Sequence, residues 1–158
     1  MASTLIETGA AARVPKLIEL GAANTKNVFG VRVDILLTGD DTAGQFCSYE
    51  CFVEPGDGPP PHVHSDDDET FYIAEGEFEV LVGDSVKTVR AGEIAHLPRG
   101  VAHTFKNIGA ATGRLLGTAT PAGHEHFFSD ADQLTRSGNL TPQTAAEVCL
   151  RYGITLLG

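Results

Sequence analysis

The sequence predicts an all-β fold of many short strands, followed by a small helical segment at the C-terminus. The 158 residues include 18 glycines and 8 prolines, which favour many tight turns. From residue 27 to residue 120, β-rich segments of about five residues recur at the 8–12-residue intervals typical of sandwiches and barrels. With 42% hydrophobic residues, the chain has enough apolar side chains to form one compact domain.

Turn residues separate the strand-like segments. A proline-rich block, Pro55–Pro61, interrupts them because proline has no amide hydrogen to donate in a central strand. The first segment ends at a Thr-Gly-Asp-Asp turn. The predicted strands are Asn27–Leu37, Gln45–Val53, Glu69–Ala74, Glu77–Val82, Ser85–Arg90, Glu93–Leu97, Val101–Asn107 and Arg114–Ala119.

The last part of the chain changes to a helical pattern. Ser129 or Asp130 is a candidate cap for one short helix, and Thr141 followed by Pro142 is a strong start for another, which Gly153 should end. We therefore expect three regions: an N-terminal arm or edge strand at 1–26, a β-barrel at 27–120, and a helical segment at 121–158 that packs on the barrel.

The charge of the chain narrows the classes of partner. Eleven basic and 21 acidic residues give a net charge of −10, which disfavours binding to nucleic acid and to anionic membranes. No apolar run approaches the roughly 20 residues of a membrane span, and Met1–Val14 does not have the pattern of a secretory signal. Cys47, Cys51 and Cys149 form no CxxC pair, so we expect free thiols in a reducing cytoplasm.

Two histidines and a glutamate form the first cluster of candidate ligands. Because alternate residues of a strand share a face, His62 and His64 should point the same way. The run Asp66–Asp68 is typical of a solvated turn, after which Glu69 should open an adjacent antiparallel strand. Two imidazoles and a carboxylate would then approach one point.

A third histidine follows a second turn. Pro98-Arg99-Gly100 should form this turn and leave His103 near the start of a strand, from which a barrel could bring it to the other three side chains. Imidazole and carboxylate ligands suit divalent transition metals. The pattern therefore predicts one ion of Fe, Ni, Mn, Cu, Co or Zn, with two positions open for other ligands.

The two stretches resemble the paired motifs of the cupin superfamily, G(X)5HXH(X)4E(X)6G and G(X)5PXG(X)2H(X)3N. Each conserved motif position is matched here: Gly56, His62, His64, Glu69, Gly76, Gly92, Pro98, Gly100, His103 and Asn107. The resemblance implies a cupin jelly-roll β-barrel in which His62, His64, Glu69 and His103 hold the metal, and in which Asn107 has a structural role.

The C-terminal segment is similar to that of small one-barrel cupins described as quercetinase-like. Pro121–Phe128 and Ala146–Ile154 carry this weaker resemblance. It implies a dioxygenase-like enzyme that acts on a small molecule of the phenolic, flavonol-like kind, with Glu69 as ligand and general base. Two alternatives stay open: an oxygen-independent isomerase, lyase or decarboxylase that uses the metal, and a non-enzymatic cupin that binds a small molecule.

Other residues have less specific signals. His124 and His126 repeat the HXH pattern, but we expect them at the surface or at the lip of the barrel. His96 should be a barrel or surface histidine, and Arg99 should be exposed. The expected apolar pocket draws on Phe46, Phe52, Phe71, Phe78, Val80 and Phe105.

By analogy with the family, we expect a homodimer. Leu5–Val14 or Leu17–Leu20 could supply an edge strand that pairs the subunits.

Overall fold

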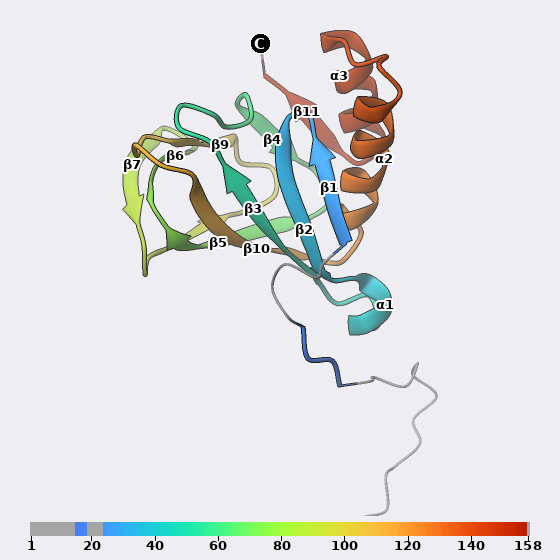
Figure 1. The fold of residues 1–158 in the computed structure, drawn as a ribbon, viewed down its shortest axis with the longest axis horizontal. Coiled ribbons are helices and arrows are strands. Elements are labelled where there is room, and N and C mark those ends of the chain that lie inside the picture. The colour runs from blue at the N-terminus through green and yellow to red at the C-terminus, as the bar shows by residue number, and fades with distance from the viewer. Residues whose placement is uncertain (1–14, 19–23, 158) are drawn as a thin grey trace, which may run out of the picture.

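The computed structural model describes residues 15–18 and 24–157. Two antiparallel sheets face each other, and two helices lie beside one end of this pair of sheets (Figure 1). The expected edge strand at Leu5–Val14 lies outside the described residues. Of the alternative edge strand, Leu17–Leu20, the structure describes only residues 17 and 18, and neither is part of a strand. Within the described part of the chain, no helix is both long enough and apolar enough to cross a membrane.

The strands divide into a six-stranded and a five-stranded sheet. The first has the order β1 (Asn24–Val28), β2 (Val31–Leu37), β3 (Cys47–Val53), β10 (Gly113–Thr120), β5 (Asp68–Glu75) and β8 (Ile94–Leu97). The second has the order β11 (Ile154–Leu156), β4 (His62–His64), β9 (His103–Asn107), β6 (Glu77–Val82) and β7 (Ser85–Arg90). Among the described residues no strand pair joins the two sheets, so the jelly roll is a pair of facing sheets and not the closed barrel that was expected.

The first expected strand, Asn27–Leu37, is in fact a hairpin. Phe29 and Gly30 both have positive φ angles, 53° and 105°, and they join β1 to β2 in a two-residue turn. Such a turn matches the twist of the flanking strands. The sequence did not predict this turn because it lies within an apolar run and because phenylalanine rarely adopts a left-handed conformation.

The three helices agree only partly with the sequence expectation. Residues 38–41 were expected to form a turn, and instead a four-residue helix, α1, spans Gly39–Thr42. The helix α3 covers Pro142–Arg151 with Thr141 as its N-cap, as expected. The helix α2 covers His124–Arg136 and begins well before the expected caps. The hydroxyl of Ser129 lies inside α2 and donates to the carbonyl oxygen of Glu125, 3.1 Å away.

A short strand, β11, follows α3 and was not predicted. Its residues Ile154 and Leu156 stand opposite His64 and His62 of β4. The amide of Ser65 also donates to the carbonyl oxygen of Gly153, at 2.9 Å. The three-residue strand that carries two candidate ligands is therefore held on one side by the C-terminal segment.

The hydrophobic core lies between the two sheets and extends under the helices. Its most completely buried members come from both sheets and from α2: Cys47, Val53, Phe78, Leu115, Ala119 and Ala131. The three cysteines are free and buried, in agreement with the sequence expectation of unpaired thiols.

Candidate metal centre

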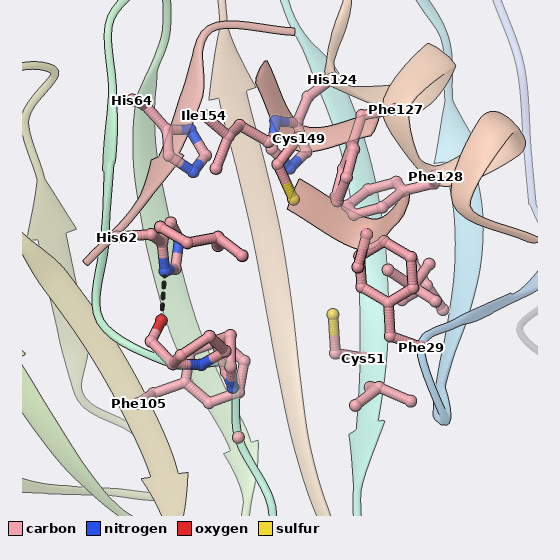
Figure 2. Close-up of a pocket in the computed structure, with 18 of the residues that line it drawn as sticks. Phe29, Cys51, His62, His64, Phe105, His124, Phe127, Phe128, Cys149 and Ile154 are labelled. Atoms are coloured by element: carbon pink, nitrogen blue, oxygen red, sulfur yellow. Dashed lines mark hydrogen bonds between the residues drawn. The ribbon is translucent and has the colours of Figure 1, made fainter. Parts of the chain in front are cut away.

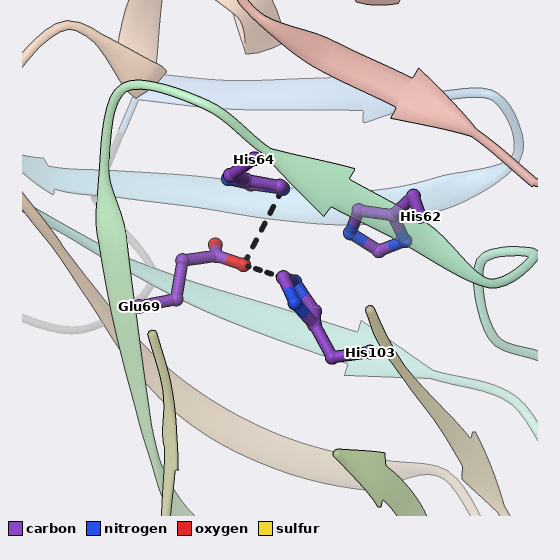
Figure 3. Close-up of side chains that lie close together, drawn as sticks. All are labelled: His62, His64, Glu69 and His103. Carbon is purple, nitrogen blue, oxygen red and sulfur yellow. Dashed lines mark ion pairs between the residues drawn. The ribbon is translucent and has the colours of Figure 1, made fainter. Parts of the chain in front are cut away.

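The four candidate ligands meet in one buried cluster. His62 and His64 come from β4, His103 is the first residue of β9, and Glu69 lies on β5 in the opposite sheet. One ligand atom from each lies within 4.8 Å of the others (Figure 3). All four are buried, the most exposed being His62 at 8%. This cluster (His62, His64, Glu69 and His103) is called the His₃Glu cluster below.

Glu69 reaches the cluster by a different route from the one expected. The turn after β4 does not return the chain to an adjacent strand, because β4 and β5 belong to different sheets. The acidic turn instead carries the chain across the gap between the sheets. Glu69 therefore faces the three histidines from the opposite wall.

The backbone determines the tautomer of two of the histidines. Nδ1 of His62 lies 2.8 Å from the carbonyl oxygen of Pro60, and Nδ1 of His103 lies 2.9 Å from that of Val101. A carbonyl oxygen can only accept a hydrogen bond, so both Nδ1 atoms carry a proton. In a neutral imidazole this leaves the lone pair on Nε2, which is the state that binds a metal.

His64 has a carboxylate behind its ring. Its Nδ1 lies 3.1 Å from Oδ2 of Asp67, and its Nε2 lies 3.7 Å from Oε2 of Glu69. A carboxylate that accepts from the outer nitrogen of a metal-binding histidine orients the ring and strengthens it as a ligand. All three histidines therefore have an acceptor at Nδ1.

Burial and neighbouring charges shift the pKa values of the cluster in different directions. Burial, with the neighbouring His103, lowers the pKa of His62 to about 4, so this ring is neutral at pH 7. Burial alone would raise the pKa of Glu69, but contacts with His103, His124 and His64 outweigh it and lower the value to about 2. Burial opposes the charged form of His103, yet contact with Glu69 raises its pKa above the ordinary value.

One ring nitrogen in the cluster lacks a partner that fits it. Nε2 of His103 is buried and has no hydrogen-bond partner among the described residues, although Oε2 of Glu69 lies 3.4 Å away. An unpaired buried nitrogen costs free energy unless something else binds it. Three imidazoles and one carboxylate form a donor set that fits a divalent transition metal.

Tyr49 supports Glu69 and was not singled out from the sequence. Its fully buried hydroxyl donates to Oε1 of Glu69. Burial and the nearby carboxylate raise the pKa of Tyr49 well above 10, so the hydroxyl remains a donor. Gly117 stands opposite Tyr49 on the neighbouring strand, and a Cβ atom there would collide with the tyrosine ring. The glycine thus makes room for the ring that positions Glu69.

Asp67 and His124 differ most from expectation. Asp67 was expected in a solvated turn, but it is 7% exposed and accepts from His64. His124 was expected at the surface or lip, but it is 8% exposed and its Nδ1 lies 3.2 Å from Oδ2 of the same aspartate. Burial alone would raise the pKa of Asp67, but the two histidines outweigh it and hold the value well below the usual range. The repeated HXH pattern was the available signal for His124.

The remaining expectations about polar residues can be compared directly with the structure. His126 and His96 are exposed, and Arg99 is exposed and paired with Asp68. Asn107 is fully buried; its side-chain nitrogen donates to the carbonyl oxygens of Val53 and Ala111, at 2.8 and 2.9 Å. These bonds give Asn107 the structural role that the motif implies.

A largely apolar cavity of about 500 Å³ opens beside the cluster (Figure 2). Of the six residues expected to line it, Phe71 and Phe105 do so, whereas Phe46, Phe52, Phe78 and Val80 are not among its lining residues. Three other aromatic side chains replace them: Phe29 from the β1–β2 turn, and Phe127 and Phe128 from α2. Strand alternation did not reveal these residues because they come from a turn and a helix.

Comparison with known proteins agrees with this geometry. Residues 49–118 match the family model described as "Cupin domain", a range that contains the whole His₃Glu cluster. A germin-like protein of Arabidopsis thaliana, subfamily 2 member 2, is 37% identical over 67 residues, which are 39% of this chain and 31% of the plant protein. The chain spans less than half the length of the curated relatives that it matches.

Solved structures share the fold at low sequence identity. An RmlC-like cupin from Shewanella frigidimarina is 20% identical with a TM-score of 0.59, over 73% of this chain and 99% of that one. The polyketide cyclase RemF from Streptomyces resistomycificus is 24% identical with a TM-score of 0.59, over 68% of this chain and 80% of that one. Residues 49–118 of this chain thus resemble a cupin domain, and the fold of the chain is shared with these solved structures.

Proposed function

We propose that this chain is a metal-dependent enzyme of the dioxygenase kind that acts on a small phenolic molecule. One divalent transition metal ion, of Fe, Ni, Mn, Cu, Co or Zn, would be held by His62, His64, Glu69 and His103. The observation that supports this most directly is that three imidazoles and one carboxylate meet beside an apolar cavity. Each imidazole has a hydrogen-bond acceptor at Nδ1, on the side of the ring away from the cluster.

The bound ion would act as a Lewis acid toward an oxygen atom of the substrate. Neighbouring groups of the protein orient the four ligands and keep Glu69 ionised. Acceptors at each Nδ1 hold the rings in one orientation, and Tyr49 holds one oxygen of Glu69. A pKa near 2 keeps Glu69 ionised, which suits a ligand better than a general base, whose pKa is most useful near the working pH. We therefore propose Glu69 as a ligand first and as an acceptor of the substrate hydroxyl proton second.

The cavity supports an aromatic substrate. Its walls include five phenylalanines, and its polar lining residues include His62, His64, Glu69 and His124. A dry, aromatic wall raises the cost of burying a charged molecule and favours flat apolar rings. A phenolic molecule would place its ring against the phenylalanines and its hydroxyl at the side of the cavity where the cluster and His124 lie.

Reconstitution with single metals tests the proposal. The protein is stripped with a chelator, loaded anaerobically with each of the six ions in turn, and offered flavonols and catechols with and without oxygen. We expect at least one metal form to consume oxygen and substrate together. Product formed without oxygen would favour the isomerase, lyase or decarboxylase alternative. Absence of any turnover would favour a binding protein.

Matched variants test the ligand assignment. We expect the double variant His62→Ala/His103→Ala to retain less than a tenth of the metal that the wild type retains, because each lost imidazole removes a ligand bond. His96→Ala and His126→Ala change exposed histidines outside the cluster and should retain metal as the wild type does. Equal metal content in all these proteins would refute the assignment.

A further inference from the structure

His124 is a buried polar side chain in the cavity wall that does not belong to the His₃Glu cluster. It is the first residue of α2, and its ring lies nearly parallel to that of His64, with centroids 5.0 Å apart and an interplanar angle of 18° (Figure 2). On other sides the ring meets Tyr49 at 5.8 Å and the edge of Phe128 at 4.7 Å. These aromatic contacts hold the imidazole in one place.

Asp67 determines the orientation of that ring. A single atom, Oδ2, lies 3.2 Å from Nδ1 of His124 and 3.1 Å from Nδ1 of His64. One carboxylate therefore orients two imidazoles, one in the cluster and one outside it. The arrangement directs the other nitrogen of His124, Nε2, away from the aspartate.

Nε2 of His124 is close to the cluster without being bonded to it. It lies 3.6 Å from Oε1 of Glu69, which exceeds a hydrogen-bond distance, and that oxygen already accepts from Tyr49. His124 also lines the cavity. Its Nε2 is thus a polar atom placed beside the cluster in a wall that is otherwise mostly apolar.

The same three residues, His64, Asp67 and His124, could in principle hold a second metal ion, since their ligand atoms lie within 4.8 Å of one another. The contacts argue against this. The ion would need the nitrogen lone pairs where protons now face Oδ2, and it would take from His64 the acceptor that directs its Nε2 into the cluster. If His124 instead binds a molecule in the cavity through Nε2, both contacts of Asp67, with His64 and with His124, are kept.

We propose that His124 is a binding residue for the molecule held in the cavity. Its Nε2 would hydrogen-bond an oxygen of that molecule, and Asp67 would act as its positioning residue. This deepens the proposed function, on which it rests, by assigning the hydroxyl group of the phenolic molecule a partner in the protein, His124. Such a hydroxyl would lose its water on entering the cavity, and His124 would replace the lost hydrogen bond.

The affinity for a matched pair of probes tests this. 2-Naphthol and naphthalene share the same ring system and differ by one hydroxyl group. The chain contains no tryptophan, so the fluorescence of either probe can be followed on titration with protein. We expect the wild type to bind 2-naphthol about tenfold more tightly than naphthalene, the effect of one good hydrogen bond. Titrations are made on the protein as isolated and again after treatment with a chelator.

His124→Phe keeps an aromatic ring in the stack but removes both nitrogens. After treatment with a chelator it should bind the two probes with equal affinity, and its affinity for naphthalene should be close to that of the wild type. His126→Phe, two residues along the same helix and exposed, is the matched control and should keep the tenfold preference. His124→Gln restores a polar group of similar reach and should recover part of the preference, which separates a binding role from a packing defect.

Three results would overturn the inference. The first is equal binding of both probes, or none, by the wild type. The second is a full preference for 2-naphthol in chelator-treated His124→Phe. The third is a bound-metal content that falls from two equivalents to one in His124→Phe, which would make His124 a metal ligand. Because chelated protein is included, in which metal-dependent turnover cannot occur, failure of this test leaves the metal-enzyme proposal standing, and absence of oxygen uptake leaves the binding role testable.

Discussion

Two histidines of the cluster are oriented by the carbonyl oxygen two residues before them in the chain. This holds for His62 with Pro60 and for His103 with Val101. The ring orientation is therefore set by local backbone geometry as well as by the packing around the site. The motif spacing identified these histidines as candidates, and the short loops before them direct the Nε2 atoms.

The residues that support the cluster from further away were harder to predict. Tyr49 and His124 are 20 and 55 positions from Glu69 in the sequence, and neither belongs to the paired motifs. Asp67 lies within the first motif but at a variable position. Asp67 follows His64 by three residues, but this spacing predicts a contact between them only when the chain is known to cross between the sheets after β4.

Asp34 supplies a prediction about stability and pH. It is fully buried on β2 and accepts hydrogen bonds from Thr25 at 2.7 Å and from Arg32 at 2.7 and 3.1 Å. Burial alone would raise the pKa of Asp34, but the bonds from Arg32 and Thr25 outweigh it and lower the value. A carboxyl whose pKa is lowered by folding stabilises the protein above its unfolded-state pKa, near 3.9, and loses this contribution as the pH falls through the lower folded-state value.

Asp34→Asn should therefore lower the free energy of unfolding at pH 7 by roughly 1 to 2 kcal/mol, a modest value because Arg32 is half exposed. The difference from the wild type should shrink as the pH falls below the unfolded-state pKa of Asp, about 3.9. Urea unfolding across this range measures it, with the exposed Asp57→Asn as the control. A difference that stays constant with pH would contradict the explanation.

At the scale of whole elements, the three-residue strand β4 depends on its neighbours for its position. It lies between β9 and β11 in the five-stranded sheet, and β11 exists because α3 ends at Arg151 and the chain turns at Gly153. The sequence predicted α3 from its cap but not β11, because three residues are too few to show strand alternation. Helix and strand together connect the C-terminal segment to the candidate site.

The cap of α3 provides a prediction at this scale. The hydroxyl of Thr141 accepts from the amide of Thr144 at 3.1 Å, and Thr141 also borders the cavity. Thr141→Ala should lower the free energy of unfolding by about 1 kcal/mol and speed hydrogen exchange at the amide of Thr144, because that amide loses its acceptor. Thr88→Ala, at an exposed position of β7, is the control. Unchanged exchange at Thr144 would show that the cap contributes little.

At the scale of the whole molecule, the candidate site lies where the two sheets and the two long helices meet. The six-stranded sheet provides Glu69 and Tyr49, the five-stranded sheet provides the three histidines, and α2 provides His124. An ion held by this set would bind the folded chain much more strongly than the unfolded chain, in which these groups are far apart.

Metal removal should consequently lower the melting temperature. At a free metal concentration of about 100 times the dissociation constant, binding adds about 2.7 kcal/mol, which corresponds to roughly 5 to 10 °C for a chain of this size. Scanning calorimetry before and after chelation measures the shift. The double variant His62→Ala/His103→Ala should show little difference between the two conditions, whereas His96→Ala should respond as the wild type does. The same melting temperature in metal-loaded and stripped wild type would contradict the prediction.

The sequence by itself determined the fold class, most strand positions, the cap of α3 and the four candidate ligands, because these follow from turn residues, alternation and motif spacing over short stretches. The homodimer stays a prediction. Only the tertiary structure decided that the sheets face each other without closing, that Glu69 approaches from the opposite wall, and that Tyr49, Asp67 and His124 gather around the cluster. The physical reason is that these contacts join segments far apart in the chain, and their geometry depends on how the two sheets and α2 pack together.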